Sequence, residues 1–103
     1  MRQHAVEITH IFPTPEFLAD FDRAPYQVKR AIDRQVMYMM NYGRFPNSMN
    51  VHKAESLNGY FIGYVTRTKS HWRVLFQIDG PVITLMRLAN HDRMDVILKE
   101  LVR

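Results

Sequence analysis

The clearest pattern in the chain is a two-residue periodicity over residues 72–79. Its large apolar side chains recur at every second position, at Trp72, Val74, Phe76 and Ile78. This alternation predicts a β-strand with one buried face. The turn pair Asp79-Gly80 follows, and residues 82–88 are predicted to return beside it as the second strand of a hairpin. Arg73 alternates with the apolar set, so we expect it on the opposite face, accessible to solvent.

Two other segments have the character of strands. Residues 6–12 are rich in β-branched and aromatic types and end at Pro13. Residues 60–67 follow the turn pair Asn58-Gly59 and have a similar composition. The sequence therefore predicts an N-terminal strand and, later in the chain, an antiparallel sheet of three to four strands.

Between the first strand and the rest of the sheet, the apolar residues recur with the spacing of α-helices. Thr14 before Pro15 is typical of a helix N-cap followed by a first-turn proline, and this helix is predicted to end before Pro25. A second helix is predicted to follow and to stop at Gly43. We expect the two helices to bury these apolar side chains: Phe17, Leu18, Phe21, Val28, Ala31, Ile32, Val36, Met39 and Met40.

A last amphipathic segment follows His91, with Asp92 available as its N-cap. Its apolar stripe consists of Met94, Ile97, Leu98 and Leu101. The order of elements predicts one α+β domain over residues 1–103, with an N-terminal strand, a helical hairpin, an antiparallel sheet of three to four strands and a short C-terminal helix. We expect the helices to pack on one face of the sheet and to leave the other face open.

Composition narrows the classes of function. The chain has no cysteine, which excludes disulfides, thiol nucleophiles and cysteine-ligated zinc. No apolar run is long enough to cross a membrane, and the first residues do not resemble a signal peptide, so we expect a cytoplasmic protein with no membrane partner. The net charge of +4 favours an anionic partner such as nucleic acid.

Two side chains are predicted to meet at one end of the hairpin. His91 follows the strand over 82–88, and Arg73 begins the strand beside it. An imidazole exchanges protons near neutral pH and a guanidinium binds phosphate, which together suit phosphodiester chemistry. From spacing alone, a structural hydrogen-bonding role for His91 stays open as the alternative. The five histidines lack the short spacings of zinc ligands, so no metal or other cofactor is expected.

Several segments, taken in order, are similar to those of one protein family. They are FLADFDRAP at 17–25, VHKAESLNG at 51–59, YVTR at 64–67 with WRVLF at 72–76, and LANHD at 88–92. In this order they resemble the RelE/ParE superfamily of bacterial type II toxin–antitoxin toxins, over most of the chain. The resemblance implies a RelE-like fold and a toxin that a cognate antitoxin neutralises in a hetero-oligomer.

The RelE-like branch of this family cleaves mRNA in the ribosomal A site without a metal. By resemblance, Arg73 stands at the catalytic arginine and His91 at the position used for proton transfer. Tyr64 and Thr66 stand where some members carry lysines, so the proton-transfer role falls to histidine. The resemblance thus implies a ribosome-dependent endoribonuclease, or mRNA interferase, that inhibits translation.

Five further residues are candidates for binding the substrate. Lys53 and Arg67 would help Arg73 to neutralise charge on the phosphoryl group. Tyr64 would stack a base, and His71 is a second candidate for proton transfer. Asp92 would orient His91, in competition with its role as N-cap.

Two other functions are compatible with the same pattern. A ParE-like inhibitor of DNA gyrase would use the fold and the basic surface without nuclease activity, and would tolerate His91→Ala. A non-toxic binding module would leave growth unchanged when it is overproduced without its partner.

Overall fold

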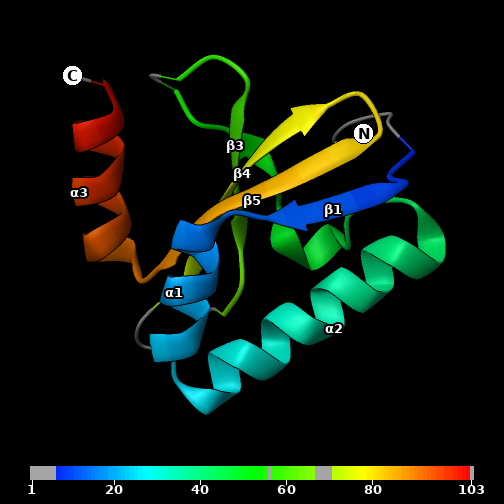
Figure 1. Cartoon of the computed structure of the whole chain (residues 1–103), viewed down its shortest axis with the longest axis horizontal. Helices are drawn as coiled ribbons and strands as arrows, with labels where there is room; N and C mark the ends of the chain where they lie inside the picture. The colour runs from blue at the N-terminus through cyan, green and yellow to red at the C-terminus, as the bar shows by residue number, and fades with distance from the viewer. Residues whose placement is uncertain (1–6, 56, 67–70, 103) are drawn as a thin grey trace.

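The computed structural model describes residues 7–55, 57–66 and 71–102. These residues form a five-stranded sheet, three α-helices and one 3₁₀ turn (Figure 1). Across the sheet the strand order is β1-β5-β4-β3-β2. The strands are β1 (His10–Pro13), β2 (His52–Lys53), β3 (Tyr60–Tyr64), β4 (Arg73–Asp79) and β5 (Val82–Ala89), and the helices are α1 (Pro15–Arg23), α2 (Tyr26–Tyr42) and α3 (His91–Val102). The predicted α+β class and order of elements are confirmed.

The hairpin of β4 and β5 forms the centre of the sheet. Asp79 pairs with Val82 across the Gly80-Pro81 turn, as predicted, and Gly80 has the positive φ of 60° that such a turn requires. A register irregularity lies between Leu75 and Phe76, yet the two strands stay paired up to their far end. The pairing of the hairpin therefore fixes which residues of β4 and β5 lie opposite each other at the end of the sheet far from the turn.

The N-terminal strand is shorter than predicted and runs parallel to β5. The sheet is therefore mixed, with β2 to β5 antiparallel and β1 added at one edge. Residue 6 lies outside the described residues, and pairing begins only at His10. Before it, the backbone N–H of Ile8 donates to the carbonyl of Gly43 at the end of α2, and the N–H of Thr9 donates to the carbonyl of Pro81 next to β5.

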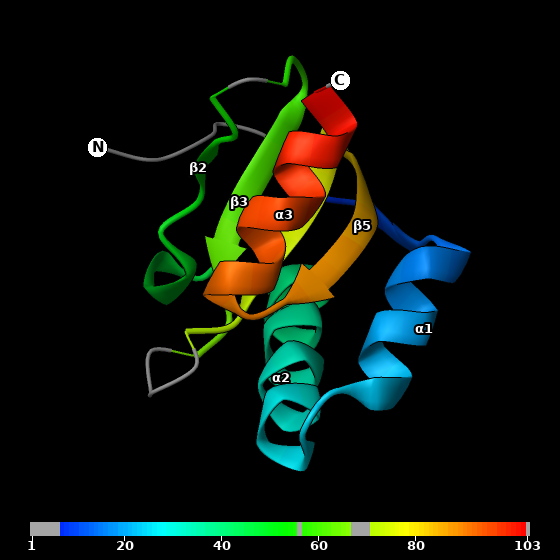
Figure 2. The ribbon, with the colours of Figure 1, turned by 90° about the vertical axis from the view of Figure 1, so that its left-hand side faces the viewer.

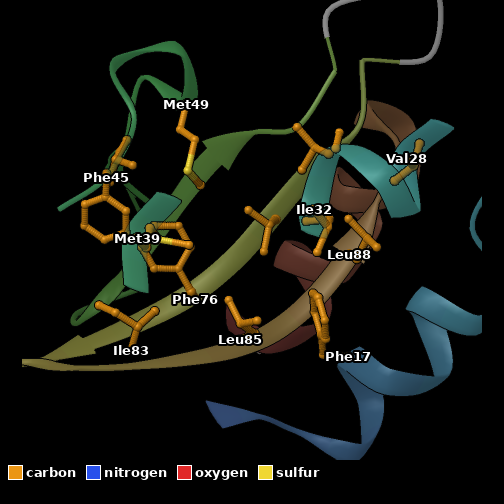
Figure 3. Packing of buried hydrophobic residues seen from close by; sticks show 14 of the residues in the cluster. Phe17, Val28, Ile32, Met39, Phe45, Met49, Phe76, Ile83, Leu85 and Leu88 are labelled. Atoms are coloured by element: carbon orange, nitrogen blue, oxygen red, sulfur yellow. The ribbon is translucent and has the colours of Figure 1, made fainter. Parts of the chain in front are cut away.

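The helices α1 and α2 cover one face of the sheet and form the main core with it (Figure 3). The Oγ1 of Thr14 accepts the N–H of Phe17 at 3.1 Å, and Gly43 ends α2 in the left-handed conformation, so both predicted helix signals are confirmed. Leu18 and Met40 were expected in the core but are 52% and 51% exposed. Both lie off the buried faces of their helices.

The prediction that the opposite face of the sheet is open is wrong, because α3 covers its middle (Figure 2). Met94 and Ile97 pack on this face, and Leu75 beneath them has no exposed surface. The side chain of Asn90, rather than that of Asp92, caps the helix, since its Oδ1 accepts the N–H of Arg93 at 2.9 Å. A site on this face must therefore lie beside α3 or beyond its ends.

Candidate functional site

The candidate site lies where β3, β4 and β5 come together at one end of the sheet. Tyr64 pairs with Arg73 and Arg73 pairs with Ala89, so these three residues form one row across the strands. Because side chains alternate along a strand, Arg73 is on the same face as Leu75 and therefore on the side of α3. A cavity of about 270 Å³ opens here and is lined by Tyr64, Thr66, His71 and Arg73.

Arg73 is the central cation of this cavity. Its guanidinium carbon lies 4.9 Å from the centre of the Tyr64 ring, a distance typical of a cation–π contact. The Nε atom is buried and has no hydrogen-bond partner among the described residues. Because Arg73 lines the cavity and keeps its charge, an anionic group that entered there could bind to its guanidinium. The arginine is thus oriented by an aromatic ring and still able to bind an anion.

Tyr64 is itself held from two sides. The Nε2 of Gln35 on α2 donates to the Tyr64 carbonyl oxygen at 3.0 Å. The imidazole of His52 approaches the ring edge-on, with 6.0 Å between the ring centres. The Arg73 guanidinium covers part of the Tyr64 ring, so a nucleotide base can stack only on the part of the ring that remains uncovered. Tyr64 therefore acts first as the support of Arg73.

His71 borders the cavity from the segment before β4. It is exposed and has a positive φ of 48°, in the left-handed region that few residues other than glycine adopt. Beside it, the N–H of Trp72 donates to the Oγ1 of Thr66 at 3.2 Å, which ties the two walls of the cavity together. Trp72 packs against the main core, in agreement with its predicted role as a core aromatic.

His52 lies beside the site: its ring contacts Tyr64, but it lines a separate cavity next to β2 and not the one around Arg73. Its Nδ1 lies 2.9 Å from the carbonyl oxygen of Asn50, and because a carbonyl can only accept, this nitrogen carries the proton. In the tautomer that this bond favours, Nε2 is the nitrogen that can accept a hydrogen bond. The histidine lies within the segment 51–59 that contributes to the family resemblance. Its role depends on the pairing of β2 with β3, which sets His52 opposite Ile62 on the same face as Tyr64.

His91 begins α3 just beyond the row formed by Tyr64, Arg73 and Ala89. The side chain is 47% exposed, and its Nδ1 lies 3.4 Å from Oδ1 of Asp92 and 4.0 Å from Oδ2 of Asp95. It does not line the cavity around Arg73. The structure thus brings His91 and Arg73 to the same end of the sheet, and a substrate would have to bridge them.

Two predicted cations remain, Lys53 and Arg67, and Lys53 does not line this cavity. Lys53 is exposed on β2 and borders a second cavity, of about 470 Å³, between β2 and the C-terminal half of α3. Arg67 lies outside the described residues. Within the described part of the chain no three His, Asp or Glu side chains gather as metal ligands, and no described helix is long and apolar enough to cross a membrane.

No protein-family model and no curated protein sequence matches the chain. Solved structures do match. The RelB–RelE antitoxin–toxin complex from Methanococcus jannaschii superposes with a TM-score of 0.70 at 13% identity, over 84% of this chain and 96% of that one. The YoeB dimer from Staphylococcus aureus gives 0.62 at 16% identity, over 81% and 97%, and the E. coli DinJ–YafQ complex gives 0.59 at 14%, over 91% and 98%. The chain therefore has the RelE-like toxin fold, as its sequence segments predict.

Proposed function

We propose that this chain is the toxin of a type II toxin–antitoxin system and that it is a metal-independent endoribonuclease that cleaves mRNA on the ribosome. The observation that carries the proposal is Arg73, which lines a cavity, has its guanidinium over the Tyr64 ring and forms no ion pair with a described carboxylate. A phosphodiester supplies the anionic oxygens that such a donor set binds. The RelE-like fold and the net charge of +4 support the same substrate class.

The chemistry requires one base, one acid and a cation. The ribose 2′-oxygen attacks the adjacent phosphorus, the base takes the 2′ proton, and the acid protonates the departing 5′-oxygen, which leaves a cyclic phosphate. Arg73 stabilises the negative charge that grows on the phosphoryl oxygens. These steps transfer protons only between RNA and side chains, so no redox partner is involved.

Histidines supply the proton transfers in this proposal. His91 is the first candidate, because it lies just past the strand end beside Arg73. His52, whose ring contacts Tyr64, and His71, which lines the cavity, are the candidates for the complementary step. In-line displacement requires the acid and the base to act on opposite sides of phosphorus, one on the attacking and one on the leaving oxygen.

The proposed partner is a cognate antitoxin that forms a hetero-oligomer with the chain. Two of the superposed structures are complexes of this kind, RelB–RelE and DinJ–YafQ. An antitoxin that carries acidic residues would complement the basic chain and cover the phosphate-binding arginine. Release of that partner would expose the site.

The test is cleavage of a defined mRNA on programmed ribosomes, with 5′ ends mapped by primer extension. Wild type is compared with Arg73→Ala, His91→Gln, His52→Gln and His71→Gln. Two variants are matched controls, Arg34→Ala for the arginine and His10→Gln for the histidines, because both residues are exposed and lie outside the cavity. We expect cuts in the A site, a loss of roughly 10²–10³ for Arg73→Ala, and wild-type rates for both controls.

The histidine variants assign the acid and the base. A proton-transfer residue contributes roughly 10²–10⁴ to the rate, so a loss of that size in His91→Gln with a second histidine variant supports the proposed pair. Wild-type cleavage by His91→Gln would remove His91 from the mechanism. If the wild type cuts no RNA but stops supercoiling by DNA gyrase, the gyrase-inhibitor function holds instead. Inactivity in both assays would leave a binding module.

A further inference from the structure

The outer side of α2 carries a stripe that no described element covers. Tyr26 and Met37 are 70% and 63% exposed, and Met40 is 51% exposed. With Arg30 and Asp33 these residues are separated by alternating steps of four and three positions, which is the spacing of a coiled-coil seam. The core-facing residues of α2, such as Ile32 and Met39, lie on the opposite side of the helix. We call the five outer residues the α2 stripe.

We propose that the α2 stripe is a self-complementary interface through which two copies of this chain form an antiparallel dimer. A two-fold interface requires that if residue i contacts residue j of the other copy, then j contacts i. In the antiparallel register that sets Arg30 opposite Asp33 of the other copy, Tyr26 falls opposite Met37. Four of the five residues then form a pattern that reads the same from either end: Tyr26 and Met37 make the two outer apolar layers, and Arg30 and Asp33 make the two charged layers at the centre. Met40 lies beyond this pattern.

The charges at the centre favour this register. Neither Arg30 nor Asp33 forms an ion pair with another described residue, although the two lie only three positions apart on one helix. The Arg30 guanidinium instead lies 5.7 Å from the centre of the Tyr26 ring, in line with the seam. In the dimer each arginine meets an aspartate of the other copy. Polar residues at a seam position fix register and orientation at some cost in affinity.

The expected interface is small. The 17 residues of α2 span roughly 25 Å, so one helix pair buries less than the roughly 800 Å² per partner of a standard stable interface. We therefore expect a dissociation constant in the micromolar range or weaker. The stripe faces away from the sheet, whereas the cavity around Arg73 lies on the α3 side, so the inference does not rest on the proposed function.

Sedimentation velocity of the purified full chain, from about 5 to about 500 µM, tests the proposal directly. We expect the wild type to shift from monomer to dimer across this range. Met37→Glu should weaken the dimer at least tenfold. Leu101→Glu is the matched control, because Leu101 is an exposed apolar residue on α3, 45% exposed, and it should leave the dimer unchanged. Circular dichroism verifies that each variant is folded.

Charge reversal tests the register. Arg30→Glu and Asp33→Arg should each weaken self-association, because like charges then meet at the centre. An equimolar mixture of the two variants should recover wild-type affinity, since one copy then presents two acids and the other two arginines. A mixture no stronger than the separate variants overturns the register. A wild type that stays monomeric to 500 µM overturns the dimer. If Met37→Glu then weakens the binding of a co-purifying protein, the stripe is the interface for that protein instead.

Discussion

Arg73 on β4 and Tyr64 on β3 are direct register partners, and the guanidinium carbon of one lies 4.9 Å from the ring centre of the other. The ring supports the cation without occupying its hydrogen-bond donors. A carboxylate in the same place would neutralise the charge that a phosphate is proposed to meet. An aromatic partner thus orients an arginine and leaves its charge available.

This arrangement predicts different outcomes for two changes at Tyr64. Tyr64→Phe keeps the ring, so cleavage of ribosome-bound mRNA should stay within about threefold of wild type. Tyr64→Ala removes the support and about 1 kcal/mol or more of cation–π attraction, and cleavage should fall at least tenfold while the fold persists. Rates from primer extension and thermal melting are measured together. Equal losses in both variants would show that the hydroxyl, rather than the ring, is required.

Gln35 links α2 to the same site through the Tyr64 carbonyl, which its Nε2 reaches at 3.0 Å. Gln35→Glu replaces the donor with a carboxylate oxygen facing a carbonyl oxygen, and we expect a loss of about 1–3 kcal/mol in unfolding free energy at pH 7. The penalty should shrink as the pH falls toward about 4, because the pKa of the new carboxyl is raised and its protonated form can donate.

Urea unfolding at pH 7, 5 and 4 measures this effect as a difference from wild type. Gln27→Glu is the control, since Gln27 is exposed on the same helix. A penalty that does not depend on pH would mean that the glutamine does not act as a donor to Tyr64.

Local signals in the sequence predicted most of the elements correctly. Three such signals act on the backbone within a few residues: the N-cap Thr14 before Pro15, the helix stop Gly43 and the turn pair Asp79-Gly80. Their effect is therefore independent of the rest of the fold. The parallel pairing of β1 with β5 was not predicted, because the partner strand lies about seventy residues away and no local pattern encodes it. Neither was the placement of α3 on the opposite face, for the same reason.

The candidate site was predictable only in part. Arg73 and Tyr64 could be named because strand alternation and the family resemblance both involve them. The contact of His52 with Tyr64 was not predictable, since it depends on the short strand β2, and the tautomer of His52 depends on a hydrogen bond to Asn50. The buried carboxylate of Asp20 was missed as well, because its partners come from a distant strand. Side chains that act through tertiary contacts leave no periodic signal.

Asp20 joins α1 to the edge of β5 beyond the end of β1. It is 7% exposed, and its Oδ2 accepts the Nε of Arg87 at 2.7 Å and the N–H of Leu88 at 2.9 Å. Asp20→Ala leaves these donors unpaired, and we expect a loss of about 3–5 kcal/mol in unfolding free energy. Asp22→Ala, a change at an exposed position of the same helix, should stay within about 0.5 kcal/mol. A small loss in Asp20→Ala would mean that water replaces the pair.

The same pair predicts a response to alkaline pH. The hydrogen bond with Asp20 raises the pKa of Arg87 above its usual value. A cation whose pKa is raised in the folded state contributes stability that is complete below the pKa of the unfolded arginine, far above neutral pH, and is lost only above it. The difference in unfolding free energy between wild type and Asp20→Ala should therefore be constant from pH 7 to about 11. A difference that shrinks over this range would contradict the assignment of Arg87 as the dominant partner.

Two residues at the start of α3, Asn90 and Asp92, could cap the helix, and the structure assigns the cap to Asn90. Asn90 accepts the N–H of Arg93 through Oδ1 at 2.9 Å, whereas the side chain of Asp92 is fully exposed. Asn90→Ala should cost about 1 kcal/mol in unfolding free energy, and Asn90→Asp should restore most of it, because aspartate caps equally well. Asp92→Ala removes an exposed charge at the helix start and its contact with His91, and it should cost less than Asn90→Ala. Urea unfolding of the three variants decides between the caps, and a larger loss in Asp92→Ala than in Asn90→Ala would return the capping role to Asp92.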